Sequence, residues 1–184
     1  MVKLALIVGS TRPNRFADRP AAWVADAAKD RTDFALDVLD LRDFALPFFG
    51  EGGGGDPSAV DAWKARVAEF DGYLVTAAEY NHGPTGVLKN ALDSAGKEWY
   101  RKPMAFIGYG GVGGARAVEQ LRLVAVELQM APIKHAVHIG GEAYWGAARE
   151  GRSLGSYDHL NDSLVAVFDQ MVWWAWALKA ARES

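Results

Sequence analysis

Two kinds of hydrophobic pattern alternate along the chain. Short apolar runs that end in glycine or polar residues indicate strands, and longer stretches with apolar residues at every third or fourth position indicate helices. The predicted strands are residues 3–8, 35–40, 72–77, 104–109 and 134–139. The predicted helices are residues 16–29, 58–70, 85–95, 114–130 and 160–181. Strands that alternate with helices in this way are typical of an α/β protein.

Strands joined by helices pair in parallel, because each helix carries the chain back across the sheet in a right-handed crossover. We therefore expect one domain over residues 1–184, with an open parallel sheet covered by helices on both faces. Ligands of such sheets bind beyond the carboxyl ends of the strands. The loops after the first, third and fourth predicted strands are expected to form one site. The long connection 42–57, with glycine at 52–55, is expected to be a lid, an interface arm or a surface loop.

The composition narrows the chemistry. A net charge of −3 lacks the clustered positive charge that nucleic-acid binding needs, so no nucleic-acid partner is expected. The chain has no cysteine, so any redox function would need a bound cofactor. His135 and His138 would point to opposite faces of a strand, and no metal site is predicted. The longest apolar segment, residues 164–178, is shorter than the ~20 residues of a membrane span. With no signal-peptide pattern at the N-terminus, we expect a cytoplasmic protein without membrane association.

The loop after the first predicted strand is suited to an anion. Residues 9–15 change from apolar to small, hydroxyl-bearing and cationic side chains just before a predicted helix. Backbone N–H groups at a helix start, the hydroxyl of Ser10 and the guanidinium groups of Arg12 and Arg15 can all donate to a phosphate. The simpler interpretation is a surface turn with incidental arginines.

The loop after the third predicted strand combines several hydrogen-bonding groups. Tyr80 can stack on a flat ring, Asn81 can both donate and accept, and Gly83 and Gly86 let the backbone approach closely. This combination predicts contact with the edge of a heteroaromatic ring. The alternative is an ordinary turn before a helix, with an exposed His82.

The loop after the fourth predicted strand, residues 108–114, contains the pattern G-x-G-x-x-G between a strand and a helix. The pattern makes a nicotinamide-dinucleotide Rossmann site an alternative. Such a site needs an acid at a strand end about 20 residues on, whereas Glu127 falls within a predicted helix. A Rossmann site would also leave the first loop unexplained. A flat ring approached by glycine backbone accounts for the loop better.

Taken together, the three loops resemble the NAD(P)H-dependent FMN reductase family of flavodoxin-like proteins, which includes quinone, azo-dye and chromate reductases. The resemblance is carried by Gly9-Ser10-Thr11-Arg12, Arg15-Phe16, Glu79-Tyr80-Asn81, the run from Gly86 to Asp93, and the run from Gly108 to Gly114. It implies a three-layer flavodoxin-like fold with a doubly wound, five-stranded parallel sheet in the order 2-1-3-4-5. Two departures are visible. Ala78 precedes the Glu-Tyr-Asn triplet where the family usually has proline, and Arg15 stands where many members have serine.

The resemblance also implies which residues contact the cofactor. The phosphate of FMN would be held by the loop that contains Ser10, Arg12, Arg15 and Phe16. The flavin ring would be contacted by Glu79, Tyr80, Asn81, Gly110 and Gly111. No side chain is predicted to be a catalytic acid or base, because the flavin itself carries the redox chemistry.

The implied activity is that of an NAD(P)H-dependent, FMN-binding oxidoreductase. Hydride would pass from NADPH or NADH to FMN N5 and then to a small acceptor, which would be a quinone, an azo compound, a flavin or a metal oxyanion. Residues 46–49 resemble a segment that helps form the family's dimer, so a homodimer or homotetramer is expected. Two other hypotheses are a flavodoxin-type electron carrier, and a binding or regulatory protein without turnover.

Overall fold

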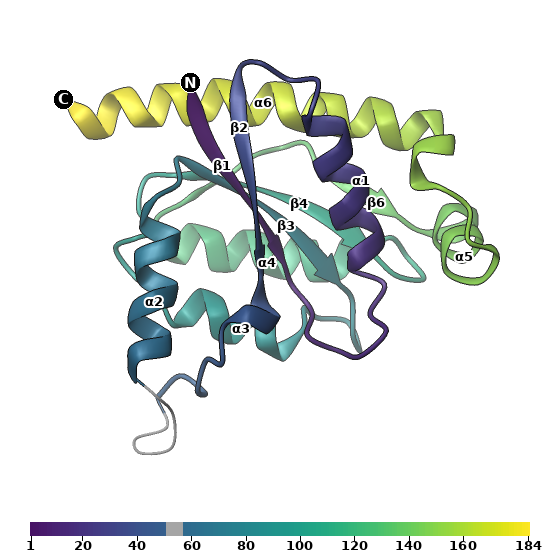
Figure 1. The fold of residues 1–184 in the computed structure, drawn as a ribbon, viewed down its shortest axis with the longest axis horizontal. Coiled ribbons are helices and arrows are strands. Elements are labelled where there is room, and N and C mark those ends of the chain that lie inside the picture. The colour runs from purple at the N-terminus through teal and green to yellow at the C-terminus, as the bar shows by residue number, and fades with distance from the viewer. Residues whose placement is uncertain (51–56) are drawn as a thin grey trace.

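The protein forms an open parallel sheet with helices on both faces (Figure 1). The structure is a computed structural model that describes residues 1–50 and 57–184. The glycine run at 52–55, for which we expected a lid, an arm or a surface loop, lies outside the described residues. The strands are β1 (Val2–Val8), β2 (Phe34–Asp40), β3 (Gly72–Ala78), β4 (Pro103–Tyr109), β5 (Ala131–Pro132) and β6 (Val137–Ile139). Their order is β2-β1-β3-β4-β5, and β6 also pairs with β4.

Helices cover the sheet in two layers. They are α1 (Asp18–Ala28), α2 (Pro57–Ala68), α3 (Gly86–Asp93), α4 (Ala115–Glu127), α5 (Gly141–Glu150) and α6 (Asp158–Glu183), with short 3₁₀ helices η1 (Leu41–Asp43) and η2 (Leu154–Ser156). Helices α1, α5 and α6 share one hydrophobic cluster with the sheet, and α2, α3 and α4 share the other. In the parts of the chain that the structure describes, no helix is both long and apolar enough to cross a membrane.

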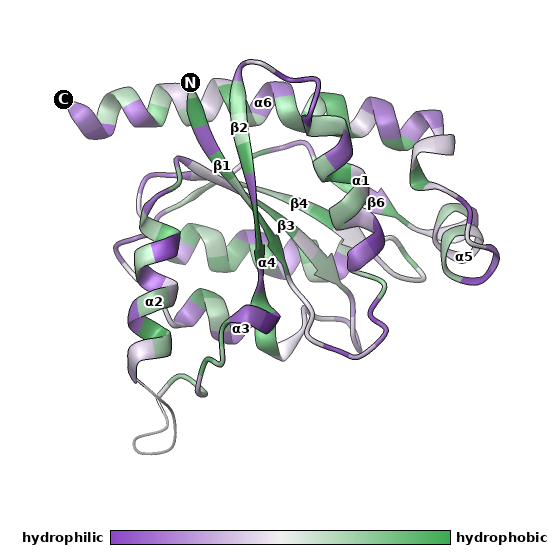
Figure 2. Ribbon diagram, viewed as in Figure 1, coloured by the Kyte–Doolittle hydropathy of each residue, from purple (hydrophilic) through white to green (hydrophobic). Residues whose placement is uncertain are grey.

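The central strands explain why the sheet is sandwiched in this way. Every residue of β3 and β4 is buried, as is all of β1 except Lys3. Figure 2 shows hydrophobic residues along these strands, and runs of this kind form parallel sheets buried on both faces. The predicted flavodoxin-like, three-layer arrangement and the sheet order 2-1-3-4-5 are confirmed.

Three predicted elements differ from the structure. The first helix begins at Asp18, so Phe16 belongs to the preceding loop. The strand predicted at 134–139 is found only as β6, over its last three residues, and an additional short strand, β5, precedes the predicted range. Between β5 and β6, Arg122 donates to the carbonyls of Ile133 and Lys134. Helix α5 was not predicted, and glycine at 140, 141 and 146 interrupts the hydrophobic pattern there. Its small residues pack against the core instead.

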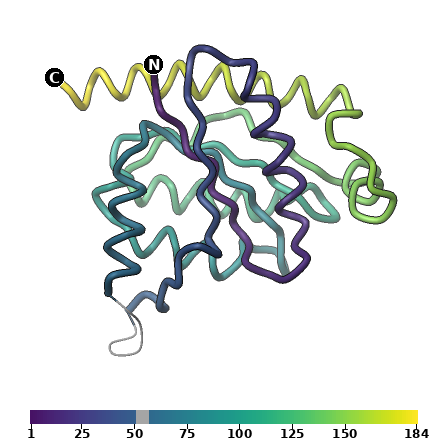
Figure 3. The backbone as a smooth tube through the Cα atoms, viewed as in Figure 1, coloured from purple at the N-terminus to yellow at the C-terminus, as the bar shows by residue number. Residues whose placement is uncertain are grey.

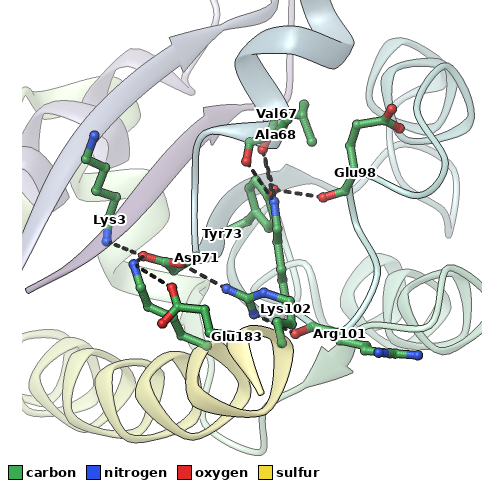
Figure 4. Close-up of polar contacts among 11 residues, drawn as sticks. Lys3, Val67, Ala68, Asp71, Tyr73, Glu98, Arg101, Lys102 and Glu183 are labelled. Atoms are coloured by element: carbon green, nitrogen blue, oxygen red, sulfur yellow. Dashed lines mark hydrogen bonds and ion pairs between the residues drawn. The ribbon is translucent and has the colours of Figure 1, made fainter.

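The amino edge of the sheet is closed by a charged cluster around Asp71 (Figure 4). Asp71 accepts hydrogen bonds from the backbone N–H of Lys3 at 3.0 Å, from Lys179 at 3.0 Å and from Arg182 at 2.9 Å. These bonds fasten the end of α6 beside the start of β1, and Figure 3 shows the two chain ends on the same side of the molecule. The three predicted loops lie at the opposite, carboxyl edge of the sheet.

Candidate functional site

The loop between β1 and α1 has the properties of an anion site. Within the described residues, no backbone N–H from Ser10 to Asp18 donates a hydrogen bond. The Ser10 side chain is buried, with 1% of the residue exposed, and its Oγ has no partner among the described residues. Backbone N–H groups that precede a helix and are not used by the protein are suited to bind a negatively charged ligand, and the buried Ser10 hydroxyl adds a donor.

Arg15 shapes this loop from beneath. Its Nε donates to Asp18 at 2.7 Å, Nη1 donates to the Ser10 carbonyl and to Asp40, and Nη2 faces Asp40 and Asp18. A guanidinium has five N–H donors, and these contacts use all of them. Burial raises the pKa of Asp40, but Arg15 and the Arg42 backbone outweigh burial and hold that pKa below its ordinary value. The structure thus places Arg15 in a buried ion pair between β2 and the loop.

Arg12 is placed differently, although it lies only three residues earlier. It is exposed, and its guanidinium carbon lies 5.6 Å from the centroid of the Tyr80 ring. The structure therefore brings the loop after β1 and the loop after β3 into contact through this pair, as expected from the parallel sheet. Arg12 and Tyr80 line both of the hollows described below.

The segment after β3 is a tight turn from Tyr80 to Gly83. The two residues exchange backbone hydrogen bonds of 2.9 and 3.1 Å, and the residues between them, Asn81 and His82, have φ of 48° and 78°. Two consecutive positive φ values identify a type I′ turn, in which asparagine is favoured. The turn exposes Tyr80 and Asn81 at the carboxyl edge. Sequence reasoning assigned the backbone freedom of this loop to its glycines, whereas Asn81 and His82 adopt the left-handed conformation.

Two residues of α4 hold this turn in place. Arg116 donates to Glu79 from Nε at 2.6 Å and from its backbone N–H at 3.0 Å, and Gln120 donates to the His82 carbonyl at 2.8 Å. The Glu79 side chain is 4% exposed. Burial raises the pKa of Glu79, but the bonds from Arg116 outweigh it and hold the pKa below its ordinary value. Glu79 is therefore an ionised anchor beneath the turn. Sequence reasoning missed both α4 residues, because contacts 37 and 38 residues apart leave no local pattern.

The glycines after β4 divide into two groups. A Cβ on Gly108 would lie 2.6 Å from the Gly113 carbonyl, and one on Gly114 would lie 2.5 Å from the Tyr109 nitrogen, so these positions let the loop fold on itself. Gly111 is exposed, with nothing within 4 Å of its Cβ position, and Gly110 has a φ of 144° that favours glycine. Gly111 is therefore open to a ligand, whereas Gly110 is buried and a Cβ there would lie 3.6 Å from the Glu79 Cβ. Because Glu127 ends α4 rather than a strand, the dinucleotide pattern lacks its acid.

Two of the hollows at this edge are lined by both Arg12 and Tyr80. One of about 230 Å³ is lined by Ser10, Thr11, Arg12, Phe48, Tyr80, Thr85, Gly86 and Val87. The other, of about 390 Å³, is lined by Arg12, Asn14, Arg15, Phe16, Arg19, Tyr80, Tyr109, Tyr144 and Ala148. Ser10, Arg12, Arg15, Phe16 and Tyr80 are thus brought together, whereas Glu79, Asn81, Gly110 and Gly111 line neither hollow. Tyr109 and Tyr144 were missed. Tyr109 was treated as part of the glycine loop, and Tyr144 lies on the unpredicted helix α5.

Comparison with known proteins identifies the family. A family model described as NADPH-dependent FMN reductase matches residues 2–143. The chain belongs to this family. It is 36% identical over 135 residues to an NAD(P)H-dependent FMN reductase of Schizosaccharomyces pombe, covering 70% of this chain and 68% of that protein. It is also 36% identical over 137 residues to a 2-hydroxy-1,4-benzoquinone reductase of a Burkholderia species, covering 70% and 73%. The resemblance noted in the sequence is confirmed.

Solved structures agree on the fold of this FMN reductase family member. FerB, a flavoenzyme NAD(P)H:(acceptor) oxidoreductase from Paracoccus denitrificans, superposes with a TM-score of 0.76 at 24% identity, over 95% of this chain and 97% of FerB. The azoreductase AzrA superposes with a TM-score of 0.57 at 15% identity, over 94% and 98%.

The residues present fit the FMN of this family. The unpaired N–H groups of the first loop, the Ser10 hydroxyl and Arg12 are donors suited to a phosphate dianion. The open backbone at Gly111 and the exposed Tyr80 ring are suited to a flat heteroaromatic ring. No group of three or more His, Asp or Glu residues that could hold a metal ion occurs in the described residues.

Proposed function

We propose that this protein binds FMN at the carboxyl edge of its sheet and uses NADPH or NADH to reduce small electron acceptors, of which quinones are the first class to test. The observation that carries the proposal is the loop from Ser10 to Asp18, where every backbone donor is unpaired within the described residues. Family membership identifies FMN as the phosphate-bearing ligand. Azo compounds, free flavins and metal oxyanions are further candidate acceptors, and neither a nucleic acid nor a membrane is a proposed partner.

We assign the cofactor contacts by loop. Ser10, Arg12 and the backbone of Phe16 hold the phosphate, and Arg15 fixes the shape of their loop through Asp40. The ring is contacted by Tyr80, Asn81, Gly110 and Gly111. Glu79 helps to position the turn after β3 through its ion pair with Arg116.

The chemistry divides between cofactor and protein. When bound, FMN supplies the redox step, taking a hydride from the nicotinamide and passing electrons to the acceptor. The chain's own groups orient the ligands and balance charge. Thr85 caps α3 by accepting a hydrogen bond from the Leu88 N–H, and the first two residues of α3, Gly86 and Val87, line the smaller hollow. This positive helix end stabilises negative charge there without a catalytic acid or base.

The purified protein provides the direct test. We expect the yellow absorbance of bound FMN, or saturable uptake of added FMN, and NADPH consumption that depends on an added quinone. A flavodoxin-type carrier would bind FMN without consuming NADPH, and a regulatory protein would do neither. Absence of FMN uptake in a titration to high micromolar concentration would contradict the proposal. A panel of quinones, azo dyes and flavins with both nucleotides then identifies the acceptor class.

We also propose that two copies associate through the segment beside the smaller hollow. Asn90 fixes this segment by donating to the Pro47 carbonyl at 2.9 Å and accepting from the Phe49 N–H at 2.8 Å. The segment holds Phe48 and Phe49 outward, 65% and 68% exposed. Adjacent exposed aromatic residues of this kind are typical of an interface.

Light scattering tests this assembly. We expect a homodimer or homotetramer at micromolar concentration, and dissociation when both Phe48 and Phe49 are changed to Ser. Changing the exposed Trp145, which lies on α5, to Ser is the matched control and should leave the mass unchanged. A wild-type protein that is monomeric throughout would refute the proposed assembly. For the compartment we propose the cytoplasm, which cell fractionation checks.

A further inference from the structure

Tyr109 carries a hydroxyl that the folded chain does not use. It is the last residue of β4, 4% exposed, and lines the hollow of about 390 Å³. Its hydroxyl has no hydrogen-bond partner among the described residues. Tyr73, the buried tyrosine at the opposite edge of the sheet, shows the usual arrangement and donates to the Val67 carbonyl at 2.6 Å. A buried donor without a partner costs free energy, so its retention needs an explanation.

The surroundings hold the Tyr109 ring at the wall of the hollow. The Phe16 ring packs against it, with centroids 5.2 Å apart, and the Tyr144 ring packs against Phe16, with centroids 4.8 Å apart. Phe16 belongs to the loop with the unpaired N–H groups. Tyr144 lies on α5 and lines the same hollow.

The charged groups around Tyr109 indicate what its hydroxyl bonds. Burial raises the pKa of Tyr109, so the hydroxyl stays protonated and available as a donor at neutral pH. The charged side chains that line the hollow are Arg12, Arg15 and Arg19, and a guanidinium can only donate. Arg15 is paired with Asp40 and Asp18, and the negative charge of Asp18 also acts on Tyr109, so the exposed Arg12 and Arg19 supply the positive charge of the hollow. A hydroxyl that faces donors and positive charge is suited to an anionic acceptor supplied by a ligand.

We propose that Tyr109 is a cofactor-binding residue whose hydroxyl donates a hydrogen bond to a phosphate oxygen of FMN, opposite the loop from Ser10 to Asp18. The inference rests on the proposed function, since it assumes that FMN occupies the site. It adds a phosphate donor from β4 to those of the first loop.

The test compares FMN with riboflavin, which lacks the phosphate. Hydrogen bonds to charged groups contribute about 1.5–3 kcal/mol, so Tyr109→Phe should weaken FMN binding about 10- to 100-fold. Riboflavin binding, measured by the same flavin fluorescence titration, should change less than about twofold. Tyr100→Phe is the matched control. Tyr100 is exposed and lies just before β4 at the opposite edge, so its change should alter neither affinity.

Thermal melting without flavin separates binding from a structural role. Because the hydroxyl has no protein partner, Tyr109→Phe should melt at or above the temperature of the wild type. A lower melting temperature, an equal loss of FMN and riboflavin affinity, or no loss of FMN affinity would each overturn the inference. If the wild type binds FMN but Tyr109→Phe does not give the expected results, the role of Tyr109 is refuted and the proposed function stands. A wild type that binds no FMN refutes the proposed function and this inference together.

Discussion

At the scale of single residues, the first loop shows that two similar side chains take different tasks. Arg12 and Arg15 are both cations in an anion loop, and their spacing in the sequence does not distinguish them. The distinction comes from Asp40, which lies 25 residues from Arg15 in sequence and ends the neighbouring strand. Arg15 satisfies this carboxylate and the Ser10 carbonyl, whereas Arg12 stays exposed beside Tyr80.

Replacing Arg15 should therefore damage the fold as well as the site. In Arg15→Met the Asp40 carboxylate loses the partner that outweighs its burial, and loss of one member of a buried pair costs about 3 kcal/mol. Denaturant unfolding should report a loss of this size, together with weaker FMN binding. Arg12→Met should weaken FMN binding with less than about 0.5 kcal/mol of destabilisation, as expected for an exposed side chain. Equal stability of the two variants would contradict the assignment.

Ser10→Ala tests a side chain that is expected to bind the cofactor without stabilising the fold. The Ser10 hydroxyl has no partner among the described residues, so its removal should leave the melting temperature of the flavin-free protein unchanged or raised. FMN affinity should fall about 10-fold, because a charge-assisted hydrogen bond is lost. Ser163→Ala, on the exposed face of α6, is the control and should keep full affinity. An unchanged FMN affinity in Ser10→Ala would remove Ser10 from the phosphate site.

At the scale of elements, hydrophobic periodicity predicted most of the fold because the central strands are apolar throughout and the helices are amphipathic. It failed where small residues pack tightly. Helix α5 buries Ala143, Gly146 and Ala147, and a run with several glycines gives no helical pattern. For the site, local motifs placed the three loops but not their supports. Arg116 and Gln120 act across two elements, and only the tertiary structure brings them to the turn after β3.

Helix α4 should control how well that turn is preorganised for the flavin. Arg116→Ala removes the charge that offsets the burial of Glu79, which should raise the pKa of Glu79 and loosen the turn. We expect FMN affinity to fall about 10-fold, and by less in Gln120→Ala, because a neutral hydrogen bond contributes only about 1 kcal/mol. Flavin titration measures both. Arg122→Ala is the matched control, since Arg122 lies on the same helix but donates hydrogen bonds to carbonyls of the segment before β6.

A double-mutant cycle tests whether Arg116 acts through its ion pair with Glu79. If Arg116 acts through Glu79, Glu79→Gln should recover part of the affinity lost in Arg116→Ala, with a coupling energy of about 0.5–3 kcal/mol. Additive losses would show that Arg116 works independently of Glu79.

At the scale of the whole molecule, the two edges of the sheet do different work. The carboxyl edge leaves donors unpaired within the described residues, whereas the amino edge pairs its charges around Asp71. Lys102 lies at this amino edge, 7% exposed, and its Nζ donates to the Tyr73 hydroxyl at 3.0 Å and to two backbone carbonyls at 3.3 Å. Burial, together with the positive charge of Arg182, lowers the pKa of Lys102 to about 8, although Asp71 and Glu98 oppose the shift.

This buried lysine should make stability depend on pH without affecting the flavin site. The unfolded chain keeps the Lys102 proton up to its ordinary pKa of 10.5, and the folded chain releases it near pH 8. Between these values the unfolded state holds more protons, so the free energy of unfolding should rise with pH, by up to about 3 kcal/mol. Denaturant unfolding from pH 7 to 10.5 should show this rise in the wild type and in Lys97→Met, which changes an exposed lysine, but not in Lys102→Met. The same FMN affinity in all three proteins would show that the two edges are independent, whereas a parallel rise in Lys102→Met would assign the pH dependence to another group.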